Sequence, residues 1–176
     1  MMHTWFECKI RYERVMENGM NKKVTEPYLV DALSFTEAEA RIIEEMTPFI
    51  SREFTISDIK RANYSELFPS DEASADRWFK CKLFFITLDD KSGAEKKTST
   101  QVLVQAADLR DAVKKLDEGM KGTMADYQIA SVSETAIMDV YPYSNEESIT
   151  DTISENANLL LYAISFNHFL KVVRQQ

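Results

Sequence analysis

Apolar and charged residues alternate near the start of the chain. In residues 6–12 every second residue is apolar or aromatic and each residue between them is charged, which is the two-residue period of a strand with one buried face. Residues 17–19 (ENG) are typical of a tight turn, and residues 24–32 form a second apolar-rich stretch. The pattern therefore predicts a β-hairpin.

A helix and a third strand are predicted after this hairpin. Ser34 is followed three residues later by Glu37, a spacing typical of a capping box, so we expect a helix that runs to about Met46. Residues 54–67 have the composition of a strand. Ile56 and Ile59 break its strict alternation, which indicates a β-bulge. The predicted order of elements is ββαβ.

The same order of elements recurs in the second part of the chain. Residues 5–10 (WFECKI) match residues 78–83 (WFKCKL), and this match includes both tryptophans and both cysteines of the protein. The second copy has a turn at 89–93, a strand at 98–106, a helix that begins at Asp108 and ends near 119–122, and a final strand at 127–141. We interpret the chain as an internal duplication of one ββαβ unit.

The predicted fold class is α+β. We expect two ββαβ repeats that are related by a pseudo-two-fold axis and form one two-layer domain, with helices packed on antiparallel sheet. A closed six-stranded barrel is the alternative. The predicted boundaries are 1–69 for repeat one, 70–77 for a linker, 78–143 for repeat two and 144–176 for a C-terminal appendage.

Apolar residues of the appendage follow a helical stripe between positions 159 and 173, which predicts an amphipathic helix. We expect this C-terminal helix either to cover the seam between the repeats or an exposed sheet face, or to contact a protein partner or a second copy of the chain. The stripe is interrupted by polar residues and is too short to span a bilayer, so no contact with a membrane is expected.

Composition and charge narrow the function classes. Acidic residues outnumber basic ones, 29 to 21, and the resulting net charge of −8 disfavours general binding to duplex DNA. Two cysteines exclude a disulfide scaffold and suit a reducing compartment. The N-terminus lacks the pattern of a signal peptide, so we expect a cytoplasmic protein.

Few residues of the types that usually carry catalysis are present. His3 and His168 are the two histidines, and the four glycines fit neither a P-loop nor a dinucleotide-binding fingerprint. We therefore assign no catalytic residue, no metal ligand and no cofactor. Carboxylates are abundant, and acidic pairs at 44–45 and 89–90 are interpreted as solvated surface. A small carboxylate- and Mg²⁺-dependent enzyme is kept as an alternative.

The repeated strands carry the candidate contact residues. Cys8 and Cys81 lie on the apolar face and are interpreted as buried structural thiols. The tryptophans lie on the opposite face with a lysine, where they either pack or stack on a base or ligand ring. Side by side, the repeats would form a basic and aromatic strip suited to single-stranded nucleic acid. The candidate residues are Trp5, Lys9, Lys22, Lys23, Trp78, Lys82, Lys96 and Lys97.

Residues 24–40 (VTEPYLVDALSFTEAEA), 106–112 (AADLRDA) and 120–123 (MKGT) carry a resemblance to a known family. The chain resembles small proteins of unknown function from gut Bacteroidetes and their phages and mobile elements, over about residues 4–143. The resemblance implies no activity and no site residues. We predict a non-enzymatic intracellular binding or interaction module that acts with a protein or nucleic-acid partner; a single-stranded nucleic-acid-binding accessory protein is the first alternative, before the enzyme.

Overall fold

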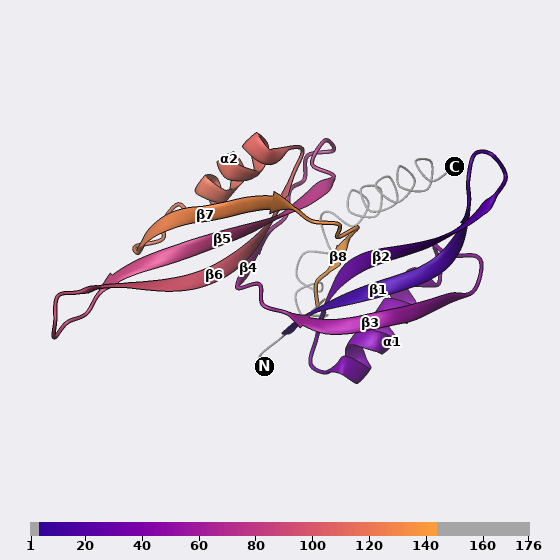
Figure 1. The fold of residues 1–176 in the computed structure, drawn as a ribbon, viewed down its shortest axis with the longest axis horizontal. Coiled ribbons are helices and arrows are strands. Elements are labelled where there is room, and N and C mark those ends of the chain that lie inside the picture. Colours follow the sequence, from indigo (N-terminus) through magenta and orange to yellow (C-terminus); the bar gives the residue numbers. More distant parts are fainter. Residues whose placement is uncertain (1–3, 144–176) are drawn as a thin grey trace, which may run out of the picture.

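The computed structural model of the protein describes residues 4–143. The elements in chain order are β1 (Thr4–Val15), β2 (Asn21–Ala32), α1 (Phe35–Met46), β3 (Phe54–Ala62), β4 (Glu66–Phe68), β5 (Arg77–Leu88), β6 (Glu95–Ala106), α2 (Leu109–Gly119), β7 (Asp126–Glu134) and β8 (Val140–Tyr141). They form a first sheet of order β3-β1-β2-β8 and a second sheet of order β4-β6-β5-β7. The two sheets lie end to end, and their long hairpins point in opposite directions (Figure 1).

The predicted fold class is wrong. The described chain is mostly β, with about half of its residues in two four-stranded sheets and only two short helices, and it is not one helix-on-sheet domain. Both sheets are open, so the barrel alternative is wrong as well. The error lies in residues 54–67 and 127–141, each of which was expected to be one strand but divides into two. The predicted C-terminal helix lies outside the described residues.

The local predictions for the hairpins and helices are confirmed. The Ser34 hydroxyl accepts the Glu37 backbone N–H at 3.1 Å, as in a capping box, and the Glu37 carboxylate reaches back to accept the N–H of Leu33, the residue before the cap, at 2.6 Å. Asp108 caps α2 in the same way by accepting the Asp111 N–H at 2.9 Å. The pairing of β3 with β1 shifts register between Lys9 and Ile10, so the expected bulge is present.

The second part of each divided strand crosses to the other sheet. β4 pairs in parallel with β6, with Leu67 directly across from Leu103, and β8 pairs in parallel with β2, with Val140 across from Leu29. Each half of the chain therefore supplies a three-stranded antiparallel core and a short edge strand for its neighbour. This reciprocal exchange ties the two sheets together.

Buried side chains hold the molecule at three places: under α1, under α2 and between the two sheets. On one side of each sheet, here called the helix face, α1 or α2 covers the alternating apolar residues that the sequence pattern identified. A further group, here called the seam, lies between the two sheets where they meet. It joins the face of each sheet that points away from its helix. Its members are Leu29, Trp78, Leu103 and Ile137, with Trp5, Ala62, Tyr64, Leu67 and Val140 packed against them. The side of each sheet away from its helix is called the open face.

Candidate functional site

The two tryptophans come together in the seam. Trp78 is only 4% exposed, and Trp5 is partly buried against the same group of residues. The carbonyl oxygen of Trp78 accepts both the backbone N–H and the hydroxyl of Thr135 at 2.8 Å. Trp78 therefore holds the segment that leads into β8, and its ring has no open side on which a base can stack.

The two cysteines are buried free thiols, as expected. Cys8 and Cys81 both lie on the helix face with no exposed surface. Burial raises the pKa of Cys8 to about 12, with further contributions from Glu7 and Asp58, and raises the pKa of Cys81 to about 11. Both side chains therefore stay protonated near neutral pH and lack the thiolate that nucleophilic or redox chemistry requires.

On the open face of the first sheet, lysines are matched by acids. Lys9 lies 3.9 Å from the Asp58 carboxylate, and Lys60 lies 3.3 Å from that of Glu7. Lys23 lies directly across the hairpin from Glu13. The three lysines of this face thus have acidic near neighbours, whereas Arg11 on the same face lies across from Thr25 and Thr55 and forms no ion pair within the described residues.

The open face of the second sheet differs. Lys80 stands where the first sheet has Glu7, and Lys82 lies across from Ser131, at the position that Asp58 occupies in the first sheet. Lys97 lies across from Ile86 and donates to Gln128 at 3.5 Å. Within the part of the chain that the structure describes, none of these three lysines forms an ion pair.

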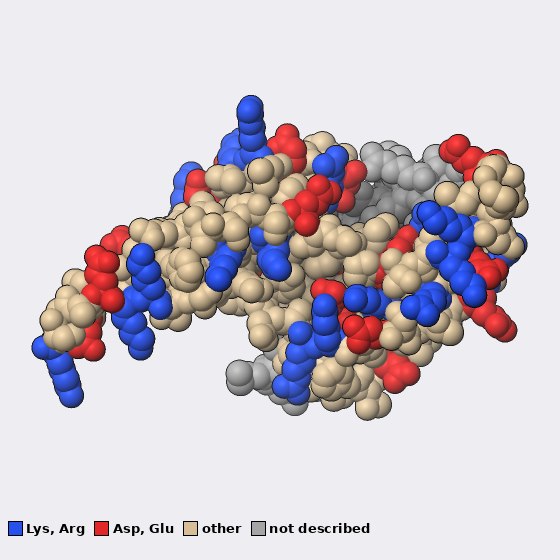
Figure 2. Space-filling model, in the orientation of Figure 1, with Lys and Arg blue, Asp and Glu red and all other residues tan. Residues whose placement is uncertain are grey.

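An aromatic ring lies among these lysines. Phe84 is half-buried, occupies the position of Arg11 in the first sheet, and has the Lys82 ammonium 5.3 Å from its ring centroid. We call the group Lys80, Lys82, Phe84, Ile86 and Lys97 the lysine face. In Figure 2, blue atoms project from the β5–β6 part of the visible surface, while the red atoms of this half gather toward the hairpin tip and along its upper edge.

A shallow depression of about 460 Å³ adjoins the lysine face. The segment between β3 and β4 forms one side of it and β6 the other; its lining residues are Asn63, Tyr64, Ser65, Ser99, Thr100 and Gln101. Ser99 lies across from Phe84, and Gln101 lies across from Lys82. The depression thus places hydroxyl and amide groups beside the half-buried Phe84 ring and the lysines.

The remaining predicted lysines lie elsewhere. Lys22 and Lys23 are exposed near the tip of the β1–β2 hairpin, whereas Lys96 and Lys97 are exposed toward the tip of the β5–β6 hairpin. The two tips are at opposite ends of the molecule (Figure 1). The structure therefore holds two separate sets of lysines, and of the predicted residues only Lys82 and Lys97 belong to the lysine face.

The first half contains a buried acid, Glu26, on β2. Glu26 is 7% exposed and accepts hydrogen bonds at 3.1 Å from the hydroxyls of both Tyr12 and Tyr28, and it also pairs with the Arg14 guanidinium. Burial, followed by the nearby Glu26 charge, raises the pKa of Tyr28 well above its usual value. Every side chain of this cluster is engaged by another, which suits a structural role.

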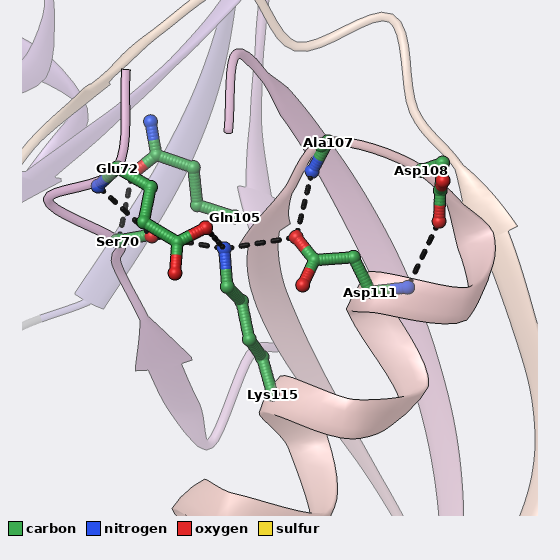
Figure 3. A network of polar contacts seen from close by, with 7 residues as sticks. All are labelled: Ser70, Glu72, Gln105, Ala107, Asp108, Asp111 and Lys115. Atoms are coloured by element: carbon green, nitrogen blue, oxygen red, sulfur yellow. Dashed lines mark hydrogen bonds and ion pairs between the residues drawn. The ribbon is translucent and has the colours of Figure 1, made fainter. Parts of the chain in front are cut away.

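A second polar cluster surrounds the start of α2 (Figure 3). The Lys115 ammonium contacts Asp111 at 2.9 Å and reaches Ser70 and Glu72 at 3.0 and 3.1 Å, in the segment that follows β4. Arg41 of α1 is the counterpart of Lys115: it donates to the Pro142 carbonyl at 3.1 Å and lies over the Tyr143 ring, after β8. Each helix therefore clamps the chain that arrives from the other sheet.

Between residues 4 and 143 no three His, Cys, Asp or Glu side chains gather closely enough to hold a metal ion. Neither described helix has the length and the apolar sequence needed to cross a membrane.

Comparison with family models matches residues 4–143 to a domain of unknown function. The chain belongs to the DUF4494 family. The prediction of membership in a family of unknown function is thereby confirmed, with the same extent along the chain. No curated protein matches the chain significantly.

Sequence reasoning missed two residues of the lysine face in this DUF4494 protein. Lys80 and Phe84 share strand parity with Trp78 and Lys82, which was visible in the alternation. The contact strip predicted from the sequence contains only residues that the two repeats share, and both positions differ from their counterparts Glu7 and Arg11. The informative signal was the difference between the repeats.

Proposed function

We propose that this protein is a non-enzymatic binding module and that the lysine face contacts an anionic ligand. The observation that supports the proposal is the set of three lysines without acidic partners, Lys80, Lys82 and Lys97, on one open sheet face. Lys80 and Lys82 stand two residues apart on one face of β5 with neutral residues across from them, so their charges gain no ion pair from folding. It does create a local positive potential, which attracts anions even though the whole chain carries −8.

The proposal modifies the predicted contact strip. It retains Lys82 and Lys97, adds Lys80 and Phe84, and gives the two tryptophans a packing role because Trp78 is buried in the seam. The lysines of the first half are not required for it. The alternative of a carboxylate- and Mg²⁺-dependent enzyme gains no support, since no acidic cluster suited to a metal occurs in residues 4–143.

The wider setting of the module also remains a proposal. The matching registers of the two sheets support an origin by internal duplication, because Leu67 meets Leu103 in one sheet as Val140 meets Leu29 in the other. An intracellular location and a link to phage or mobile-element functions remain predictions. So does contact with a protein partner or a second copy through residues 144–176.

A base-free polyanion tests the proposal. We expect a fluorescently labelled heparin oligosaccharide to bind the full-length protein at low salt, measured by fluorescence anisotropy. The triple variant Lys80→Gln, Lys82→Gln, Lys97→Gln should bind about tenfold more weakly, since each exposed ionic contact contributes roughly 0.2–1 kcal/mol.

The matched control is the triple variant Lys9→Gln, Lys23→Gln, Lys60→Gln, which removes the same charge from the open face of the first sheet. Its affinity for heparin should stay within about twofold of wild type, because these lysines already have acidic neighbours. Equal losses in the two triple variants would show that net charge matters and the lysine face does not.

A further inference from the structure

We infer that the ligand of the lysine face is a single-stranded nucleic acid, with a base stacked on Phe84. This inference rests on the proposed function and narrows its ligand class. An anion site needs only positive charge, whereas this face also carries a half-buried aromatic ring among the lysines. Proteins that bind single strands without strict sequence preference combine these two features, because every base has a flat face that stacks and every nucleotide carries a phosphate.

The strand geometry suits an extended ligand. Lys80, Lys82, Phe84 and Ile86 are successive open-face positions of β5, so their side chains follow one another at roughly 7 Å intervals. β5 runs from the junction of the two sheets toward the tip of its hairpin (Figure 1), and the row lies in the part of β5 that has β6 on one side and β7 on the other. A single strand lying along this row would meet two lysines first and then the ring, with Lys97 on the neighbouring strand.

The neighbouring polar groups suit the edges of bases. Gln101, Ser99 and Gln128 lie directly across from Lys82 or Phe84, and Ser99 and Gln101 also line the 460 Å³ depression beside the ring. Tyr64 supplies a second aromatic ring to that depression. Amide and hydroxyl side chains donate and accept hydrogen bonds to base edges that a single strand leaves free.

Duplex nucleic acid and acidic peptides fit this face less well. In a duplex the bases are already stacked, and no described helix projects from the lysine face to enter a major groove. An acidic peptide would use the lysines and leave the Phe84 ring without a planar partner. The ring therefore distinguishes the three ligand classes.

Salt dependence gives a quantitative expectation. For single strands the slope of log K against log salt is about −0.7 per contacted phosphate, so three lysine contacts predict a slope of about −2. Affinity should then fall about fifteenfold between roughly 50 and 200 mM salt. The Lys80, Lys82, Lys97 triple variant should lose most of this slope.

The decisive experiment compares probes that differ in their bases. The full-length protein is titrated against labelled DNA and RNA strands of about 20 nucleotides, the corresponding DNA duplex, the heparin oligosaccharide and a poly-glutamate peptide of about the same length. We expect the single strands to bind more tightly than the duplex and the peptide. The relative affinities of the DNA and RNA strands show which of the two is preferred.

Phe84→Leu is the sharpest variant, because it keeps an apolar side chain and removes the ring. We expect it to weaken single-strand binding at least about fivefold and to leave heparin binding unchanged, while Phe84→Trp retains single-strand binding. Thermal melting of each variant checks that the fold is intact.

The outcomes separate the two proposals. If heparin binds at the lysine face but single strands do not, or if Phe84→Leu leaves single-strand binding unchanged, the inference fails and the anion-binding module stands. Poly-glutamate binding as tight as that of the single strands would assign an acidic protein partner in place of nucleic acid. No binding of heparin, peptide or oligonucleotide at low salt would overturn both proposals.

Discussion

The two halves of the molecule share one topology and differ in chemistry. Each has a long hairpin, one helix, a bulged third strand and a short edge strand exchanged with the other half. In the first half, polar groups are paired: Glu26 is buried with two tyrosines and an arginine, and the open-face lysines have acids beside them. In the second half the Glu26 cluster is absent, and Lys80, Lys82 and Lys97 form no ion pair within the described residues.

This contrast shows which positions the fold constrains. The helix-face apolar residues and the seam are equivalent in both halves, because each sheet must bury one face under its helix and one end against its neighbour. The outer part of each open face is in contact with water, so its side chains do not have to be buried. The two halves differ there, as they also do at the Glu26 cluster on the helix face, and the proposed ligand-binding surface is part of the open-face difference.

The strongest disruption should come from the seam, which both halves share. We expect Trp78→Ala to lower the free energy of unfolding by about 3–5 kcal/mol, because it leaves a large cavity around a side chain that is only 4% exposed. Trp5→Ala should cost less, since part of that side chain already contacts solvent. Urea denaturation of both variants measures the difference.

A milder substitution tests the role of Trp78 in the seam if Trp78→Ala does not fold. Trp78→Phe should remain folded and lose roughly 1–2 kcal/mol. Equal costs for alanine at Trp5 and Trp78 would contradict the assignment of Trp78 to the centre of the seam.

The buried acid of the first half offers an intermediate effect. Glu26→Thr should destabilise the protein by about 1–3 kcal/mol, because it leaves the hydroxyls of Tyr12 and Tyr28 and the Arg14 guanidinium without their common acceptor.

Removing the whole cluster brings the first half closer to the second. The combined variant Tyr12→Phe, Arg14→Thr, Glu26→Thr, Tyr28→Phe should recover most of the stability lost in Glu26→Thr, since no buried polar group is then left without a partner. Chemical denaturation of the two variants side by side measures the recovery. A combined loss larger than the single one would mean that the cluster contributes net stability beyond satisfying its own members.

The smallest effect concerns pH at the start of α2. The pKa of Asp111 lies below its usual value of 3.8. The hydrogen bond from the Ala107 backbone N–H makes the largest contribution, and the hydrogen bond from the Lys115 side chain makes the next. Because the folded state binds this proton less readily than the unfolded state, the stabilisation is present above pH 3.8 and is lost as the pH falls through the lower, folded pKa.

We therefore expect wild type to melt at a slightly higher temperature than Asp111→Asn near neutral pH, and this gap should close as the pH falls below about 3.8. Differential scanning calorimetry across the acid range measures the gap. A gap that stays constant down to the lowest pH would show that the Asp111 charge has no part in the stabilisation.

Local elements were predictable because their causes are local. The capping residues Ser34 and Asp108 and the alternation in β1 and β5 all act over a few residues, and the structure contains each of these elements. The fold class was not predictable in the same way. Nothing in residues 54–67 indicates that the chain leaves one sheet after Ala62 and joins the other at Glu66.

The candidate site, like the fold, was predictable only in its local features. Alternation placed Lys82 and the tryptophans on one strand face, and the sequence by itself determined this much because side-chain direction repeats every two residues. Only the tertiary structure decided that Trp78 is covered by Leu29 and Leu103, and that Lys82 faces Ser131 while Lys9 faces Asp58. Those outcomes depend on the register between strands far apart in the chain, and register is set by the packing of the whole sheet.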